Sequence, residues 1–358
     1  MKVLMINNRP PNCGIGEYTY SLNSAMKASL NSDVEMISWQ GERTESLYRI
    51  LRERRNLQYI EEVWRVLSQA LFIMGIPKNY QVYHVTNGSL GIIARRVGPC
   101  VVTVHDLVTF TSPRDLTDRL IRKSHQAVKY ADRIICVSQT TKNDLLHFID
   151  IEPEKIKVIY EGVDHNRFYP RDRNKCRKIL DLNPDDYIVL HVGSEEPRKN
   201  IPALIQAFYH LHNEIPESIL VRVGEKTSPS QELIKSLKLE DKVMYFRDVS
   251  DLEMFYSAAD ILCFPSYEEG FGLPPLQAMA SGCPVIASNR TSIPEVVGDA
   301  GILVDPENVR GFAQWMIDIY RNMETRLKLT AASIERSKLF AWDKCAAETL
   351  EVYREIAS

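Results

Sequence analysis

The chain has 358 residues, of which 44% are hydrophobic and 25% charged, and its formal net charge is −3. The length suggests two domains of ordinary globular size, and the small net charge argues against the strongly basic surface of a nucleic-acid-binding protein. Seven scattered cysteines without a C-x-x-C pair argue against a disulfide framework and a zinc site, so we expect reduced thiols in a cytoplasmic protein. No run approaches the ~20 apolar residues that span a bilayer.

The first segments alternate apolar strands with helical patterns. Residues 3–6 predict a buried strand, and a loop with Gly14 and Gly16 leads into a helix from about Glu17. This order suits phosphate binding, but Thr19 stands where a third glycine would complete a dinucleotide fingerprint, so an ordinary strand–helix turn is the alternative. Residues 43–72 predict a basic amphipathic stretch, which fits either a solvated outer face or contact with an anionic membrane surface.

Polar residues follow the strand predicted at residues 101–104. His105 and Asp106 stand at its carboxyl end, where open α/β sheets bind their ligands. A histidine can donate or accept a proton near neutral pH, although a satisfied structural imidazole is the alternative. Strands are predicted again at residues 131–138 and 157–164, and the polar stretch 168–175 suits a linker between two domains.

The strand and helix alternation starts again after the linker. Residues 187–192 predict a strand, its loop follows, and a helix begins at about Ile201. Arg198 and Lys199 therefore stand between a strand end and a helix N-terminus, where two cations would clamp a diphosphate. A solvated pair of loop cations is the alternative. Further strands are predicted at residues 219–224 and 243–246.

The most informative stretch runs from Ser266 to Gly282, between two apolar runs that predict buried parallel strands. A glycine-rich loop opens into a helix whose first turn accepts Pro274 and Pro275, and Gly282 is a plausible stop. The predicted anion-binding amides are those of Gly270, Phe271, Gly272 and Leu273. Glu269 stands directly before them, so the expected ligand has both a diphosphate and hydroxyl groups, as a nucleotide sugar does.

This stretch, with Glu269-Gly270-Phe271-Gly272-Leu273-Pro274 and Ala278-Met279-Ala280 before Gly282 and Pro284, resembles the Glu-x7-Glu signature of the retaining glycosyltransferases of family 4. The resemblance implies an α/β protein with the GT-B fold, in which two Rossmann-like, doubly wound domains face a central cleft. The implied domains are an acceptor-side domain at residues 1–165 and a nucleotide-sugar domain at residues 166–339, with a helix at about 340–358 packed back onto the first.

The resemblance also implies roles for single residues. His105 would face the donor sugar and the acceptor, the loop of Gly14 and Gly16 would lie over the donor phosphates, and the backbone near Val249 would contact the base. Many members have an arginine where this chain has Ser194, so the arginine role is carried over to Arg198. The second acid of the signature, which binds the ribose hydroxyls, is replaced by Gln277.

The sequence thus predicts a retaining hexosyltransferase that uses a GDP- or UDP-linked sugar as donor and a glycan, a lipid-linked or a small-molecule acceptor. Its predicted catalytic residues are His105, Arg198, Lys199 and Glu269. No Asp-x-Asp follows a strand end, so neither a metal nor another cofactor is predicted. The Pro-Arg-Lys-Asn loop favours GDP-mannose, and a peripheral contact of the first domain with the inner face of the membrane stays open.

Two other functions fit the same residues. A nucleotide-sugar epimerase of similar build would convert the donor without an acceptor. A catalytically silent nucleotide-sugar-binding partner subunit is suggested by the loss of the acid at Gln277.

Overall fold

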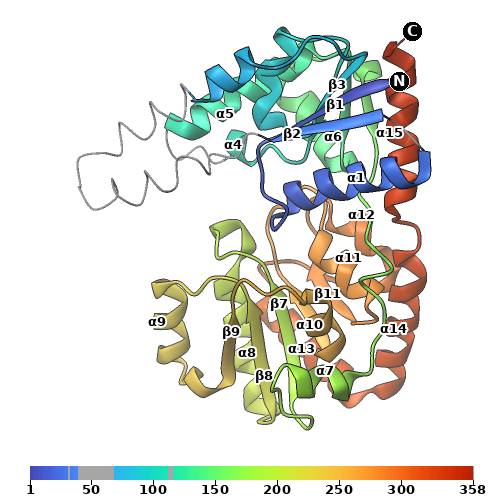
Figure 1. Cartoon of the computed structure of the whole chain (residues 1–358). Coiled ribbons are helices and arrows are strands. Elements are labelled where there is room, and N and C mark those ends of the chain that lie inside the picture. The colour runs from blue at the N-terminus through green and yellow to red at the C-terminus, as the bar shows by residue number, and fades with distance from the viewer. Residues whose placement is uncertain (31–32, 39–67, 112–115, 358) are drawn as a thin grey trace. The chain divides into compact units, whose positions relative to one another are not determined.

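The computed structural model describes residues 1–30, 33–38, 68–111 and 116–357, which Figure 1 draws as ribbons. The chain divides into two compact units, Met1–Gly162 with Trp342–Ser358 as the first and Val163–Ala341 as the second. The division predicted from the sequence lies after residue 165 and at about residue 340. Of the predicted amphipathic stretch 43–72, residues 68–72 are helical, and the remainder lies outside the described residues.

The first unit is built on a parallel six-stranded sheet with the strand order β2-β1-β3-β4-β5-β6. Its strands are β1 (Lys2–Asn7), β2 (Asp33–Ser38), β3 (Val82–Val85), β4 (Cys100–Val104), β5 (Arg133–Cys136) and β6 (Ile156–Val158). Parallel strands are covered on both faces and therefore consist of apolar runs, and every residue of β3 and β4 is buried. The chain changes direction across the sheet between β1 and β3, which makes this pair the topological switch point.

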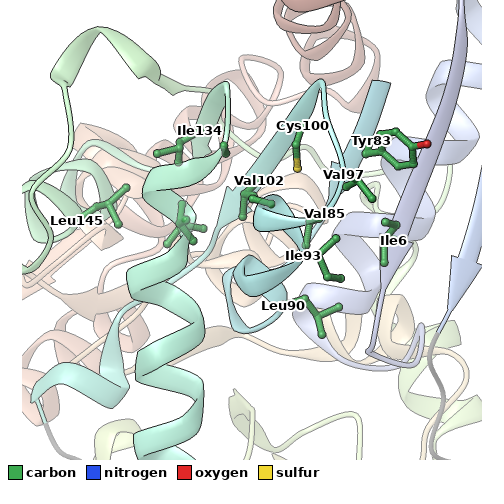
Figure 2. Packing of buried hydrophobic residues seen from close by; sticks show 14 of the residues in the cluster. Ile6, Tyr83, Val85, Leu90, Ile93, Val97, Cys100, Val102, Ile134 and Leu145 are labelled. Atoms are coloured by element: carbon green, nitrogen blue, oxygen red, sulfur yellow. The ribbon is translucent and has the colours of Figure 1, made fainter. Parts of the chain in front are cut away.

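Helices cover this sheet and complete its core. They are α1 (Gly14–Leu30), η1 (Gly88–Arg95), α4 (Val108–Thr111), α5 (Leu116–Gln126), η2 (Ala127–Tyr130), α6 (Gln139–Phe148), η3 (Pro153–Lys155) and α15 (Trp342–Ala357). Figure 2 shows part of the apolar cluster beneath them, in which Leu90 and Ile93 of η1 and Leu145 of α6 join Val85 and Val102 of the strands.

The last helix, α15, belongs to the first unit although it comes after the whole of the second in the chain. It packs beside α1. The Tyr353 hydroxyl lies 2.6 Å from Nδ1 of the buried His84, and Arg133 donates to Glu355 over 3.0 Å. One buried hydrogen bond and one surface ion pair therefore fix the register of α15 on the sheet.

The second unit repeats the plan with a parallel six-stranded sheet in the order β12-β11-β10-β7-β8-β9. Its strands are β7 (Tyr187–Val192), β8 (Ser218–Val223), β9 (Val243–Phe246), β10 (Ile261–Phe264), β11 (Val285–Ser288) and β12 (Ile302–Val304). Both units are thus doubly wound α/β structures, which confirms the predicted fold class. The switch point of this sheet lies between β7 and β10, the two strands that precede the predicted cation loop and the glycine-rich loop.

The helices of the second unit lie on both faces of its sheet. They are α7 (Arg173–Ile179), η4 (Pro197–Lys199), α8 (Ile201–Glu214), α9 (Ser228–Ser236), η5 (Glu240–Lys242), α10 (Leu252–Ala258), α11 (Leu273–Ala280), α12 (Ile293–Val297), η6 (Gly298–Ala300), α13 (Val309–Arg321) and α14 (Met323–Ser337). Among the helices that the structure describes in either unit, none combines the length and the apolar character needed to cross a membrane.

A charge cluster around the buried Asp260 lies at the amino ends of β7 and β10 in the second unit. Asp260, directly before β10, accepts from Arg173 over 2.9 Å, from Arg177 over 2.7 Å and from Arg326 over 2.6 Å. The amide of Ile188 also donates to this carboxylate, over 2.6 Å. The cluster ties α7, α14 and the start of β7 together at the end of the sheet opposite to the predicted loops.

Candidate functional site

The loop that follows β7 carries two of the predicted cationic residues. It begins at Gly193, whose φ of 145° lies in a region that side chains rarely adopt. Pro197 opens the short helix η4, and Asn200, with a φ of 54°, ends it and stands before α8. The Asn200 amide donates to the carbonyl of Pro306 over 2.8 Å, so the turn that holds both cations has a fixed end.

The loop that follows β10 is held by hydroxyl groups from the loop after β11. The amide of Glu269 donates to the Thr291 hydroxyl over 3.1 Å. The Ser292 hydroxyl lies 2.8 Å from the carbonyl oxygen of Glu269 and 2.9 Å from that of Phe271. Gly272 has a φ of 118°, which favours glycine, and α11 begins at the next residue. The backbone before α11 is thus fixed on both sides of Glu269.

These two loops meet at the carboxylate of Glu269. Lys199 Nζ donates to Glu269 Oε1 over 2.7 Å, and Arg198 Nη1 lies 3.3 Å from Glu269 Oε2. The exposed fractions of the side chains are 10% for Lys199, 9% for Glu269 and 21% for Arg198. The structure therefore brings together three of the residues that the sequence singled out, at the switch point of the second sheet.

Backbone contacts strengthen the same junction. The amide of Tyr267 donates to the carbonyl of Arg198 over 2.7 Å, and Arg198 Nη1 donates to the carbonyl of Glu268 over 3.2 Å. Arg198 Nε also donates to Glu196 over 2.8 Å, and Glu196 is 47% exposed. The guanidinium thus bridges a solvated carboxylate on its own loop and the buried edge of the neighbouring loop.

The arrangement suits an anionic ligand that also carries hydroxyl groups. A lysine ammonium has three donors, so Lys199 can keep its bond to Glu269 and direct others to a ligand, and the guanidinium of Arg198 adds a second positive charge beside it. The N-terminus of α11 adds a partial positive charge at residues 270–273. The carboxylate of Glu269 accepts hydrogen bonds and would do the same for hydroxyl donors of a ligand.

Two further predicted residues lie apart from this junction. Gln277, on α11, is 3% exposed, and its Oε1 accepts from the Tyr256 hydroxyl of α10 over 3.0 Å. Val249 is half-buried in the loop after β9, the edge strand of the sheet. The carbonyl of Ser250, the residue after Val249, accepts from Arg167 over 2.9 Å.

In the first unit His105 is 7% exposed at the end of β4. Its Nδ1 lies 2.9 Å from Glu161 Oε1, and its Nε2 lies 3.0 Å from the carbonyl oxygen of Thr86. The ring of Tyr18 stands edge-on to the imidazole, with 4.7 Å between the ring centroids. Both ring nitrogens therefore already have an oxygen partner within the unit.

The predicted glycine loop of the first unit turns sharply before α1. Gly14 is the first residue of this helix, three residues earlier than expected. A Cβ atom at Gly16 would lie 1.7 Å from the carbonyl oxygen of Pro10, so only glycine fits where the loop folds back on the helix. The close approach gives the glycine a steric reason that is independent of any ligand.

Comparison with known proteins places this geometry in a family. The profile described as "Glycosyl transferases group 1" matches residues 172–336, and that described as "Glycosyltransferase Family 4" matches residues 14–167. The O-antigen chain mannosyltransferase B of Escherichia coli is 30% identical over 321 residues, which cover 86% of this chain and 83% of that protein. The chain belongs to glycosyltransferase family 4.

Other relatives agree with this assignment. A D-inositol 3-phosphate glycosyltransferase of a Nocardioides species is 29% identical over 309 residues, which cover 77% of this chain and 67% of that protein. Sucrose-phosphate synthase from Thermosynechococcus elongatus has a TM-score of 0.79 at 22% identity and covers 99% of both chains. Alr3699/HepE from Anabaena, solved with UDP and glucose, has a TM-score of 0.78 at 18% identity, covering 99% of this chain and 100% of that one.

The structural likeness confirms the predicted GT-B fold, and the family confirms the predicted enzyme class. The protein is thus a retaining glycosyltransferase that transfers a sugar from a nucleotide sugar.

Sequence reasoning missed several residues of this glycosyltransferase that the structure places at the predicted sites. They are Glu161 beside His105, Glu196 beside Arg198, and the hydroxyls of Thr291 and Ser292 beside Glu269. A signal existed for the last two, because they lie within four residues of the end of the apolar strand β11. Glu161 carries no local signal, since its partner lies on a strand far away in the sequence.

Two further observations bear on cofactors and ligands. Within the described residues, no three His, Cys, Asp or Glu side chains are grouped so that they could hold a metal ion. A hollow of about 360 Å³ lies between α9 and β9, and none of the predicted site residues lines it. It is lined by Lys226, Ser228, Gln231, Glu232, Ile234, Lys235, Glu240, Val243 and Tyr245.

Proposed function

We propose that this glycosyltransferase moves a mannosyl group from GDP-mannose to a glycan or lipid-linked acceptor with retention of configuration, without a metal. The observation that carries the proposal is the convergence of Arg198 and Lys199 on Glu269 at the switch point of the second sheet. The choice of mannose is supported by the relative named O-antigen chain mannosyltransferase B and by the Pro-Arg-Lys-Asn loop.

In this proposal Arg198 and Lys199 hold the diphosphate of the donor. Phosphate oxygens match both the planar fork of a guanidinium and the point charge of an ammonium. The amides of Gly270, Phe271, Gly272 and Leu273 would receive the charge that develops on the leaving diphosphate. Removing one such donor typically costs about 2.7–4 kcal/mol of transition-state stabilisation.

The remaining predicted residues take supporting roles. Glu269 would accept from the sugar hydroxyls, Gln277 from the ribose hydroxyls, and the backbone at Val249 would contact the base. In the first unit the loop of Gly14 and Gly16 would lie against the phosphates, and His105 would face the sugar. The bonds that His105 makes to Glu161 and Thr86 then define the orientation of its ring.

The reaction proceeds by exchange of one bond at the anomeric carbon. The bond to the diphosphate oxygen breaks, the acceptor oxygen bonds to the same carbon on the same face, and the departing phosphate takes the proton of the acceptor hydroxyl. Positive character on the sugar and negative charge on the diphosphate grow together, so the cations of the second unit act where charge develops. No side-chain nucleophile is required.

A UDP-linked sugar is the second candidate donor. It is favoured by the neighbour Alr3699/HepE, which was solved with UDP-glucose and has a TM-score of 0.77. The two donors differ in the base, and the loop at Val249 is where a difference in base would be read.

Thermal unfolding with GDP, UDP and ADP tests the donor base, because a ligand that binds only the folded state raises the midpoint. GDP is expected to give the largest shift, and radiolabelled GDP-mannose should then transfer its sugar to a glycan acceptor. A larger shift with UDP overturns the choice of GDP. An isomer formed from the donor alone indicates an epimerase, and saturable donor binding without transfer or hydrolysis indicates a silent partner subunit.

A further inference from the structure

A charged side chain lies wholly inside the second unit, beneath the loop with the two cations. Arg222, on β8, has an exposed fraction of 0%. Its Nη1 donates to Nδ1 of His191 on the adjacent strand β7, and its Nη2 donates to Glu195 Oε1 over 3.2 Å. A buried guanidinium without a counter-charge is costly, so its contact with Glu195 is a structural requirement.

Glu195 lies in the loop after β7, and its side chain is 2% exposed. Its Oε2 accepts from the Thr227 amide over 3.2 Å, from the Thr227 hydroxyl, and from Ser230 over 2.6 Å. Its Oε1 also accepts from the Tyr245 hydroxyl over 3.2 Å. The carboxylate thus caps the N-terminus of α9 and anchors its own loop to β8 and β9 at once.

The ionised state of Glu195 agrees with this anchoring. Burial acts to raise the pKa of this carboxyl, but hydrogen bonds from Ser230 and Thr227 and the charge of Arg222 outweigh it and lower the pKa. The carboxylate is therefore kept ionised and remains the counter-charge of the guanidinium.

His191 connects the same cluster to Lys199. Burial, together with the charges of Arg222 and Lys199, lowers the pKa of His191 well below its usual value, so the ring is neutral and accepts at Nδ1. The imidazole stacks on Phe264, with 5.7 Å between the centroids, and Lys199 Nζ lies 5.5 Å from the same Phe264 ring. A Cβ atom at Gly193 would lie 3.4 Å from His191 Cε1 and 4.0 Å from Lys199 Cε.

The backbone of the loop is held by the same strands. Gly193 donates to the carbonyl of Val223 over 3.0 Å, and a Cβ atom at Gly224 would lie 2.2 Å from the carbonyl oxygen of Gly193. The start of the loop therefore rests directly on the end of β8, where the side chain of Arg222 also lies.

We propose that His191, Arg222 and Glu195 are positioning residues that hold loop 193–200 in the conformation in which Lys199 and Arg198 reach Glu269. Glu195 of this loop binds Arg222 of the sheet, and the two cations of the same loop, Arg198 and Lys199, bind Glu269. It cannot leave the sheet without removing the counter-charge of a buried guanidinium, which keeps the cations in one place before a ligand arrives. The inference rests on the proposed function of these cations in binding the diphosphate.

The test compares Arg222→Met with the matched control Arg326→Met, which removes a partner of the buried Asp260 at the opposite end of the same sheet. Three quantities are measured: the unfolding midpoint, amide hydrogen exchange of residues 193–200 without ligand, and KM and kcat for the nucleotide-sugar donor. Both variants should lower the midpoint. Only Arg222→Met should accelerate exchange in residues 193–200 and raise the donor KM by roughly tenfold or more, with a smaller change in kcat.

A further variant, Arg222→Lys, keeps the buried charge but cannot serve both partners with one fork, so its KM and exchange rates should lie between those of wild type and Arg222→Met. The proposal is overturned if Arg222→Met lowers the midpoint but matches Arg326→Met in exchange and KM, because the cluster then only stabilises the fold. If the wild-type protein binds no nucleotide diphosphate, the proposed function fails and the link to the donor with it. The exchange comparison still decides whether the cluster holds the loop.

Discussion

In each of the two units, a loop that follows a strand carries a carboxylate that contacts a basic side chain. In the second unit Glu269 meets Lys199 and Arg198, and in the first unit Glu161 meets His105. Both carboxylates are less than a tenth exposed, at 9% and 4%. The pairs differ in hydrogen-bonding capacity, because the ammonium of Lys199 has three donors, whereas the imidazole has only two nitrogens.

We call His105 and Glu161 the closed pair, because both nitrogens of the imidazole already have partners, whereas the site at Glu269 can take up a ligand. Lys199 can turn further donors toward a phosphate without leaving the carboxylate of Glu269. Both nitrogens of His105 are engaged, by Glu161 and by the Thr86 carbonyl. The comparison therefore predicts that substitutions in the second unit act mainly on donor binding and transfer, and that substitution of Glu161, the partner of His105, acts mainly on stability.

The largest effect is expected for Lys199→Ala. The loss of this ammonium removes one donor to the leaving diphosphate, so the rate of transfer should fall roughly 10²–10³-fold, or about 2.7–4 kcal/mol. Steady-state kinetics with the donor measures it. The matched control is Lys328→Ala, which removes another lysine paired with a glutamate, here 73% exposed on α14. Equal rates in both variants would contradict the proposed role of Lys199.

Acid should destabilise the first unit through His84. Burial, with a smaller contribution from His105, lowers the pKa of His84 to about 3. The unfolded chain takes up this proton near pH 6.5, so the contribution of His84 to stability is full above that pH and falls as the pH drops toward 3. The loss is about 1.4 kcal/mol per pH unit, or about 2.7 kcal/mol at pH 4.5.

Urea unfolding between pH 4.5 and pH 7.5 measures this dependence. His84→Gln replaces the imidazole by a side chain that does not titrate. The free energy of unfolding of this variant should therefore fall less steeply as the pH drops, by the slope that the uptake of one proton contributes, whatever its value at pH 7.5. Equal slopes in the variant and the wild type would show that the folded protein protonates His84 as readily as the unfolded chain does.

Glu161→Gln tests the closed pair itself. The amide keeps an oxygen near His105 Nδ1 but loses the charge, and a poorly matched buried polar pair costs about 1–3 kcal/mol. Urea unfolding should show this loss, while the donor KM stays near that of wild type. A stable variant with a large loss of transfer would contradict this expectation and show that the charge of Glu161 is needed for the role of His105 in the reaction.

Much of the second unit could be predicted from the sequence because its signals are local. Arg198 and Glu269 each lie a few residues beyond an apolar run, and parallel strands end at one edge of a sheet. The start of α11 at Leu273 and the φ of 73° at Gly282 confirm the predicted proline start and glycine stop. That the two loops meet was expected only from the family resemblance, because it depends on β7 lying next to β10, and local sequence does not encode strand order.

The closed pair of the first unit was hidden for the same reason. The strand predicted at residues 157–164 is shorter than expected, because β6 ends at Val158, and Val163 forms a bridge with Ala341 instead. Glu161 thus lies in an irregular segment whose path is set by distant contacts. A histidine at a strand end was visible in the sequence, but the oxygens that engage it were not.

The smallest effect is expected for Gln277→Glu, which restores the acid of the family signature. Gln277 is buried, and its Oε1 accepts from the Tyr256 hydroxyl over 3.0 Å, a bond that a carboxylate would keep. A charged acceptor binds hydroxyl donors more strongly by about 1 kcal/mol, so the donor KM should fall roughly fivefold with kcat unchanged. Tyr256→Phe is the control, because it removes this hydrogen bond without adding charge and should change KM less. If Gln277→Glu lowers the unfolding midpoint and leaves KM unchanged, residue 277 only packs against α10, and the ribose must be bound elsewhere.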